Sequence, residues 1–199
     1  RVEMKRLMAV ACLVCSIAAG AKGEPVEPIK TVEIGKYREL VVNGKPFFPI
    51  MSWAQSSRRY QMLAGLGINT HAGDRADVEA AKAAGCYVVT SFDPSLTGNP
   101  QVLAWIHGDE PDMPQGRGAD AKPRRSPEEI IAIYRQIKEA DRTRPVFVTF
   151  TACFMKEDGR FPAEVKEKVY PEFVKGCDVA GFDIYPIYGS GYASHLDWV

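Results

Sequence analysis

From Val32 onward the chain alternates between strand-like and helix-like segments, and this alternation limits the fold more than any other feature. Apolar runs of strand character begin six times, with amphipathic segments or compact turns between them. The six starts are Phe47, Ile68, Cys86, Val102, Pro145 and Asp178. Strands joined by crossovers in this way form a parallel sheet with right-handed connections. The sequence therefore predicts an α/β fold.

Three local signals sharpen this pattern. Asn43-Gly44 stands between two apolar runs, residues 40–42 and 45–48, and predicts a hairpin with a two-residue type I′ turn. Ser126-Pro127-Glu128-Glu129 predicts the start of a helix, because it combines a capping box with proline at the first helical position. Residues 93–100 are too few for a full crossover helix, so we expect a compressed turn there.

Two parallel-sheet architectures compete. A doubly wound sheet suits 199 residues, whereas a complete (β/α)8 barrel needs about 250. However, Ser52-Trp53-Ala54-Gln55 follows the first strand where a doubly wound fold would carry a glycine-rich phosphate loop. Side chains capable of chemistry also gather at the carboxyl ends of the strands, as on the catalytic face of a barrel. We therefore expect an incomplete (β/α)8 TIM barrel with about six of its eight strands, over residues 47–199, after a hairpin region at 24–46.

The first 23 residues are organised like an export signal. Basic Met4-Lys5-Arg6 precedes an apolar run at residues 7–19, which is too short to cross a bilayer about 30 Å thick. Ala21 and Gly23 supply small residues for cleavage near Gly23. We predict a signal peptide over residues 1–23, a secreted or periplasmic protein, and no membrane span after cleavage. An uncleaved anchor is the alternative.

Charge and cysteine content argue against nucleic-acid binding, a disulfide framework and a zinc site. The chain has 25 basic and 25 acidic residues, of which 21 and 24 follow the leader. A weakly acidic surface lacks the basic patch that binds nucleic acid. The cysteines after the leader are odd in number and widely spaced, so they predict neither a disulfide framework nor a zinc site. A Cys153–Cys177 pair and buried thiols both remain open.

The segment Trp105-Ile106-His107-Gly108-Asp109-Glu110-Pro111-Asp112 is the most suggestive of chemistry. Strand alternation groups Glu110 with Ala104, and places Leu103 and Trp105 on the helix-facing side. Partial burial at the edge of the sheet would raise the pKa of Glu110 and suit it to general acid catalysis. The alternative is a cluster that caps a helix beginning at Pro111.

Other candidates lie at the ends of other strands. Asp183 and Tyr185 share one face of residues 179–186, although Asp183 could instead bind loop amides. Trp53 could stack on a sugar ring or belong to the core. His71 and His107 lack the spacing of a metal site, so we predict no metal and no other cofactor.

Four segments, taken in order, resemble secreted clan A glycoside hydrolases, including β-galactosidase-like relatives. They are residues 42–50, 103–111, 137–145 and 181–186, which are similar to the entry hairpin with the first strand, the fourth strand, the lead into the fifth strand, and the sixth strand of that family. The resemblance implies that Glu110 is the acid/base and that Asp109 occupies the neighbouring substrate-binding position. It also implies a retaining mechanism whose glutamate nucleophile follows a seventh strand, beyond this chain.

We therefore expect a secreted retaining glycoside hydrolase, represented by an amino-terminal fragment that lacks its nucleophile and is inactive alone. Glu110 would protonate the leaving glycosidic oxygen. The residues expected to bind the carbohydrate substrate are Asp109, Asp183, Tyr185, Trp53 and His71. A non-catalytic carbohydrate-binding or surface protein with the same type of barrel is the alternative.

Overall fold

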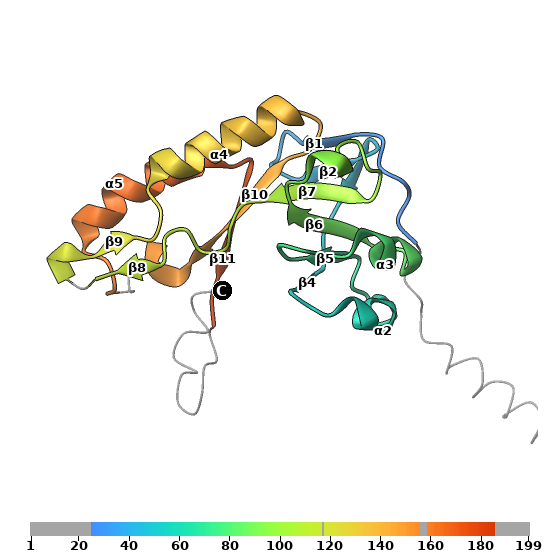
Figure 1. Ribbon diagram of the computed structural model, residues 1–199, viewed down its shortest axis with the longest axis horizontal. Helices are drawn as coiled ribbons and strands as arrows, with labels where there is room; N and C mark the ends of the chain where they lie inside the picture. Colours follow the sequence, from blue (N-terminus) through green and yellow to red (C-terminus); the bar gives the residue numbers. More distant parts are fainter. Residues whose placement is uncertain (1–24, 117, 156–158, 186–199) are drawn as a thin grey trace, which may run out of the picture.

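The computed structural model describes residues 25–185 except 117 and 156–158, so the expected signal peptide lies outside the described residues. Its main element is a curled sheet of six parallel strands (Figure 1). These are β4 (Met51–Trp53), β5 (Thr70–Ala72), β6 (Tyr87–Ser91), β7 (Val102–Ile106), β10 (Val146–Thr151) and β11 (Val179–Asp183). The prediction of six parallel strands is confirmed. Their spatial order follows the chain, without the reversal that defines a doubly wound sheet.

The links between the strands are poor in helix. Helices α2 (Tyr60–Ala64) and α3 (Val78–Ala83) have five and six residues, and the link from β6 to β7 holds only the 3₁₀ turn η2 (Pro94–Leu96). The longer helices are α4 (Pro127–Ala140) and α5 (Ala163–Phe173), which both lie over β10 (Figure 1).

The prediction of an incomplete (β/α)8 TIM barrel is therefore wrong. The described residues form an open, curled parallel sheet with few helices, and the helices do not build the outer ring that defines that barrel. One reason is local: Gly67 and Gly85, with φ of 96° and 72°, follow α2 and α3 and help to end these helices early.

An antiparallel sheet precedes the parallel one. Its strands are β1 (Val32–Ile34), β2 (Leu40–Val42) and β3 (Lys45–Phe47). The predicted hairpin between β2 and β3 is confirmed, because Asn43 and Gly44 have the positive φ values, 53° and 78°, that a type I′ turn requires. The expected start of the first parallel strand at Phe47 is wrong, because β3 ends at Phe47 and β4 begins only at Met51. Pro49 cannot donate to a ladder, and the Asn69 side chain hydrogen-bonds the backbone of Phe48 and Ile50 instead.

Two apolar clusters cover opposite faces of the parallel sheet. Trp105 lies in the cluster on the helix side, as predicted. Leu103 lies in the other cluster, against the antiparallel sheet, so its predicted position is wrong. The cause is a register shift: Val88 pairs with Val102 and Val89 with Ala104, which leaves Leu103 as an extra residue and reverses the alternation.

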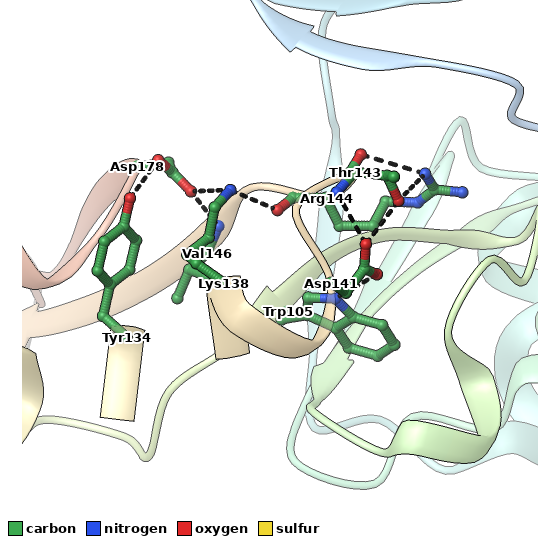
Figure 2. A network of polar contacts seen from close by, with 8 residues as sticks. All are labelled: Trp105, Tyr134, Lys138, Asp141, Thr143, Arg144, Val146 and Asp178. Atoms are coloured by element: carbon green, nitrogen blue, oxygen red, sulfur yellow. Dashed lines mark hydrogen bonds and ion pairs between the residues drawn. The ribbon is translucent and has the colours of Figure 1, made fainter. Parts of the chain in front are cut away.

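A buried polar network ties α4 and β7 to the start of β10 (Figure 2). The Asp141 carboxylate accepts hydrogen bonds from the Trp105 indole nitrogen at 2.9 Å and from the Thr143 hydroxyl at 2.6 Å. Arg144, only 3% exposed, donates from Nε to the Val102 carbonyl at 2.6 Å. The network holds the amino-terminal ends of β7 and β10 together.

A second carboxylate continues this network at the start of β11. Asp178 accepts from the Tyr134 hydroxyl at 2.9 Å, from Lys138 Nζ at 3.1 Å and from the backbone nitrogen of Val146 at 2.9 Å (Figure 2). Tyr134 and Lys138 belong to α4, whose amino terminus carries the predicted capping box at Ser126. Helix α4 is thereby fixed against two strands.

The remaining elements are short. They are η1 (Ser57–Arg59), β8 (Pro114–Gln115), η3 (Gly118–Asp120), β9 (Lys122–Pro123), η4 (Ala152–Phe154) and η5 (Val174–Gly176). In the described part of the chain, no helix has the length and apolar character to span a bilayer. No disulfide forms among the cysteines of that same part.

Candidate functional site

The loop after β7 runs along the neighbouring strand β10. The His107 N–H donates to the Phe147 carbonyl at 3.0 Å, and the Glu110 N–H donates to the Thr149 carbonyl at 3.1 Å. Glu110 has a φ of 44°, in the left-handed region that side chains with a Cβ rarely adopt. Backbone strain of this kind is typical of functional sites and persists only where the surroundings enforce it.

Asp112 anchors this loop two residues after Glu110. Its fully buried carboxylate accepts hydrogen bonds from the Thr151 backbone nitrogen at 2.9 Å, from the Thr151 hydroxyl at 2.8 Å and from the Tyr170 hydroxyl at 2.7 Å. Thr151 ends β10 and Tyr170 lies in α5, so Asp112 fixes the loop to both. Sequence reasoning did not assign this role, because both partners lie 39 residues or more away along the chain.

Glu110 is half-buried in an acidic environment. Burial raises its pKa, and the negative charges of Asp109 and Asp183 raise it further. The pKa of Asp109 is also raised, first by burial and then by Asp183 and Asp74. The Arg124 guanidinium opposes both shifts without cancelling them.

Tyr185 joins the same group. Its hydroxyl donates to Asp183 Oδ2 at 2.9 Å, and this hydrogen bond raises the pKa of the phenol. The negative charge of Asp183 raises the pKa of Tyr185 further, and the charges of Glu110 and Asp109 raise it by smaller amounts. The structure thus brings together four of the residues singled out in the sequence. We call Asp109, Glu110, Asp183 and Tyr185 the acidic group.

The arrangement suits proton transfer. A carboxyl group whose pKa is raised keeps its proton to a higher pH, and a carboxylic acid at the edge of a sheet can donate it to a bound substrate. The alternative interpretation as a helix cap is wrong, because the element that follows Pro111 is the strand β8 and no described helix begins there.

Trp53 and His71 occupy different environments. Trp53 ends β4 with 39% of its surface exposed, and it pairs with Ala72 in the register of β4 and β5. His71 has no exposed surface: its Nδ1 lies 2.7 Å from Ser52 Oγ, and its ring stacks on Tyr60 with centroids 3.6 Å apart. His71 is therefore a core residue here, and the structure does not bring it to the acidic group.

Within residues 25–185, apart from the undescribed positions, no three His, Cys, Asp or Glu side chains are arranged to hold a metal ion. His71 and His107 are both buried, and burial lowers the pKa of each imidazole. Burial therefore favours the neutral form of both rings.

Comparisons with known proteins bear on the fold. No protein-family model and no curated protein sequence matches the chain. A solved structure of a glycosyl hydrolase family 2 member from Bacteroides cellulosilyticus matches 77% of this chain, with a TM-score of 0.52 and 15% sequence identity. A second structure of such a member from that species matches 84% of the chain, with a TM-score of 0.52 and 14% identity.

A β-glucuronidase from Parabacteroides merdae also aligns, with 14% identity over 84% of this chain and 24% of its own, but its TM-score of 0.49 is too low to carry a conclusion. The chain spans about a quarter of the length of the two family 2 structures, 24% and 25%. These two matches show that the chain shares its fold with a part of these two structures.

Proposed function

We propose that the protein is a glycoside hydrolase in which Glu110 is the general acid/base. The observation that carries this proposal is the setting of Glu110: strained backbone, partial burial, and a pKa raised by burial and by neighbouring carboxylates. These are properties of a side chain that delivers a proton. The fold shared with a part of the two family 2 structures supports the same reaction class.

Within this proposal the rest of the acidic group binds the sugar. Asp109 and Asp183 can accept hydrogen bonds from sugar hydroxyls, and Tyr185, 61% exposed, offers a phenol beside them. Trp53 offers an exposed aromatic surface on which the apolar face of a sugar ring can stack. We also propose that the leader at residues 1–23 exports the protein to a carbohydrate substrate outside the cytoplasm.

A retaining mechanism requires a second carboxylate about 5–5.5 Å from the acid/base. We do not assign that role to Asp183, because the resemblance places it at a substrate-binding position. We propose that the nucleophile comes from a part of the protein outside this chain. The chain matches only about a quarter of the length of each family 2 structure, which is consistent with this proposal.

The test uses the complete reading frame that contains this chain. Glu110→Gln should lower kcat on glycosides with poor leaving groups by about 10²–10⁴-fold, and much less on activated aryl glycosides that need no protonation. Glu139→Gln, an exposed glutamate on α4, is the matched control and should keep full activity.

Undiminished hydrolysis in Glu110→Gln would exclude Glu110 as the acid. If the intact protein binds oligosaccharides in calorimetry but turns none over, the non-catalytic carbohydrate-binding function replaces the hydrolase. If it neither binds nor cleaves them, both functions are excluded.

A further inference from the structure

A cavity of about 360 Å³ lies on the helix side of the parallel sheet, beneath α4. Much of its wall is apolar and comes from Phe92, Ile130, Ile133 and Ile137. Gly108 and Gln136 also line it, and both are exposed, so the cavity opens to solvent beside them. Its size falls within the range of small-molecule sites, which are mostly apolar with a few polar groups.

His107 is the buried polar group in this wall. Its side chain belongs to a residue that is only 2% exposed, and neither Nδ1 nor Nε2 has a hydrogen-bond partner of normal geometry among the described residues. The Gly176 backbone lies close enough to the ring to raise the pKa of His107, but it forms no hydrogen bond of normal geometry with either nitrogen. Buried polar groups are nearly always paired, so an unpaired imidazole lining a cavity indicates that something else occupies it.

Arg125 supplies a positive charge to the same cavity. It is exposed, lies just before α4, and lines the cavity together with His107. Its charge acts on the imidazole strongly enough to lower the pKa of His107, in addition to the larger effect of burial. No described residue forms a hydrogen bond or ion pair with its guanidinium, so this cation is available to a ligand.

We propose that the cavity binds a small organic acid with an apolar body, whose carboxylate lies between Arg125 and His107. The guanidinium would form a charge-assisted hydrogen bond, and the neutral imidazole would donate a second one. The ring or short chain of the ligand would pack against Phe92, Ile130 and Ile133. This site shares no residue with the acidic group, so it stands or falls independently of the hydrolase function.

Benzoate and hexanoate are suitable probes, titrated into the full chain by calorimetry and followed by the imidazole NMR signals of His107. We expect one-site binding that shifts those signals, and binding of benzyl alcohol, the neutral analogue, at least about tenfold weaker. Arg125→Gln should weaken benzoate binding about tenfold or more, and Ile133→Trp should abolish it by filling the cavity. Arg135→Gln, on an exposed arginine of α4 that does not line the cavity, should change the Kd less than about twofold.

The proposal is overturned if neither acid binds saturably, or if Arg125→Gln binds benzoate as tightly as the wild type does. It is also overturned if a high-resolution structure with benzoate present shows only ordered water at His107. Should Ile133→Trp fail to fold, Arg125→Gln decides the matter, because Arg125 is exposed and its loss leaves the core unchanged.

Discussion

The two ends of the parallel sheet hold carboxylates in opposite electrostatic settings. At the amino-terminal end, burial acts to raise the pKa of Asp141, but hydrogen bonds from Thr143 and Trp105 and the charge of Arg144 outweigh it and lower the pKa. At the carboxyl end, burial and neighbouring negative charges both raise the pKa of Glu110.

A carboxylate therefore has a different role at each end of the sheet. Donors surround Asp141, so its charged form is favoured in the folded state and stabilises it. Other acids surround Glu110, so its charged form is disfavoured and its pKa is raised. A fold carries such an unfavourable cluster only where other contacts hold it in place, as Asp112 does here.

The largest effect on stability is expected from Asp141→Ala. The change would leave the Trp105 indole N–H without its acceptor and the buried Arg144 guanidinium without a nearby negative charge. We expect the free energy of unfolding in urea to fall by about 3 kcal/mol. Because the folded-state pKa of Asp141 is lowered, its contribution is present above the unfolded pKa and is lost as the pH falls through the folded value. A loss no greater than that of the exposed-site control, Glu139→Gln, would contradict this account.

A smaller effect should separate two tyrosines with similar hydrogen bonds. Tyr170→Phe removes a donor from the fully buried Asp112, and Tyr134→Phe removes one from the partly exposed Asp178. We expect losses of about 1–2 kcal/mol and about 0.5–1 kcal/mol, respectively.

The two variants should also differ in their effect on activity. Only Tyr170→Phe should lower the activity of the complete protein, because only Asp112 holds the loop that carries Glu110. Equal activities in the two variants would show that the Tyr170 hydrogen bond to Asp112 does not help to position Glu110.

The smallest effect is expected at the carboxyl end, and with the opposite sign. Glu110→Gln removes a charge from a cluster of like charges, so it should raise the free energy of unfolding at pH 7 by a few tenths to about 1 kcal/mol, since solvent screens these interactions. The folded-state pKa of Glu110 is raised, so its favourable contribution is complete below the unfolded pKa. That contribution is lost as the pH rises through the folded-state pKa.

Urea titrations between pH 4 and 7, about the ordinary range of carboxyl groups, should show a free energy of unfolding that varies less with pH in Glu110→Gln than in the wild type. A destabilised variant, or one with an unchanged pH profile, would contradict the raised pKa.

The acidic group could be predicted in part. Strand alternation and the Asp-Glu-Pro segment pointed to Glu110, Asp109, Asp183 and Tyr185, which the structure does bring together. His71 lies in a strand as expected, but it is buried against Tyr60 of α2 instead of facing a substrate. Its neighbours depend on how α2 packs on the sheet, which the local sequence does not specify. The sequence pattern specified which residues follow each strand, but not which face of the sheet each one meets.

By itself, the sequence determined the features that depend only on residues close together in the chain. The Asn43-Gly44 turn, the Ser126 capping box and the six strands all follow from local chemistry and periodicity. Only the tertiary structure decided how much helix separates the strands, where Leu103 shifts the register, and how Asp112 anchors the loop of Glu110. Those features depend on contacts between residues far apart in the chain, which the order of side chains in any one segment does not encode.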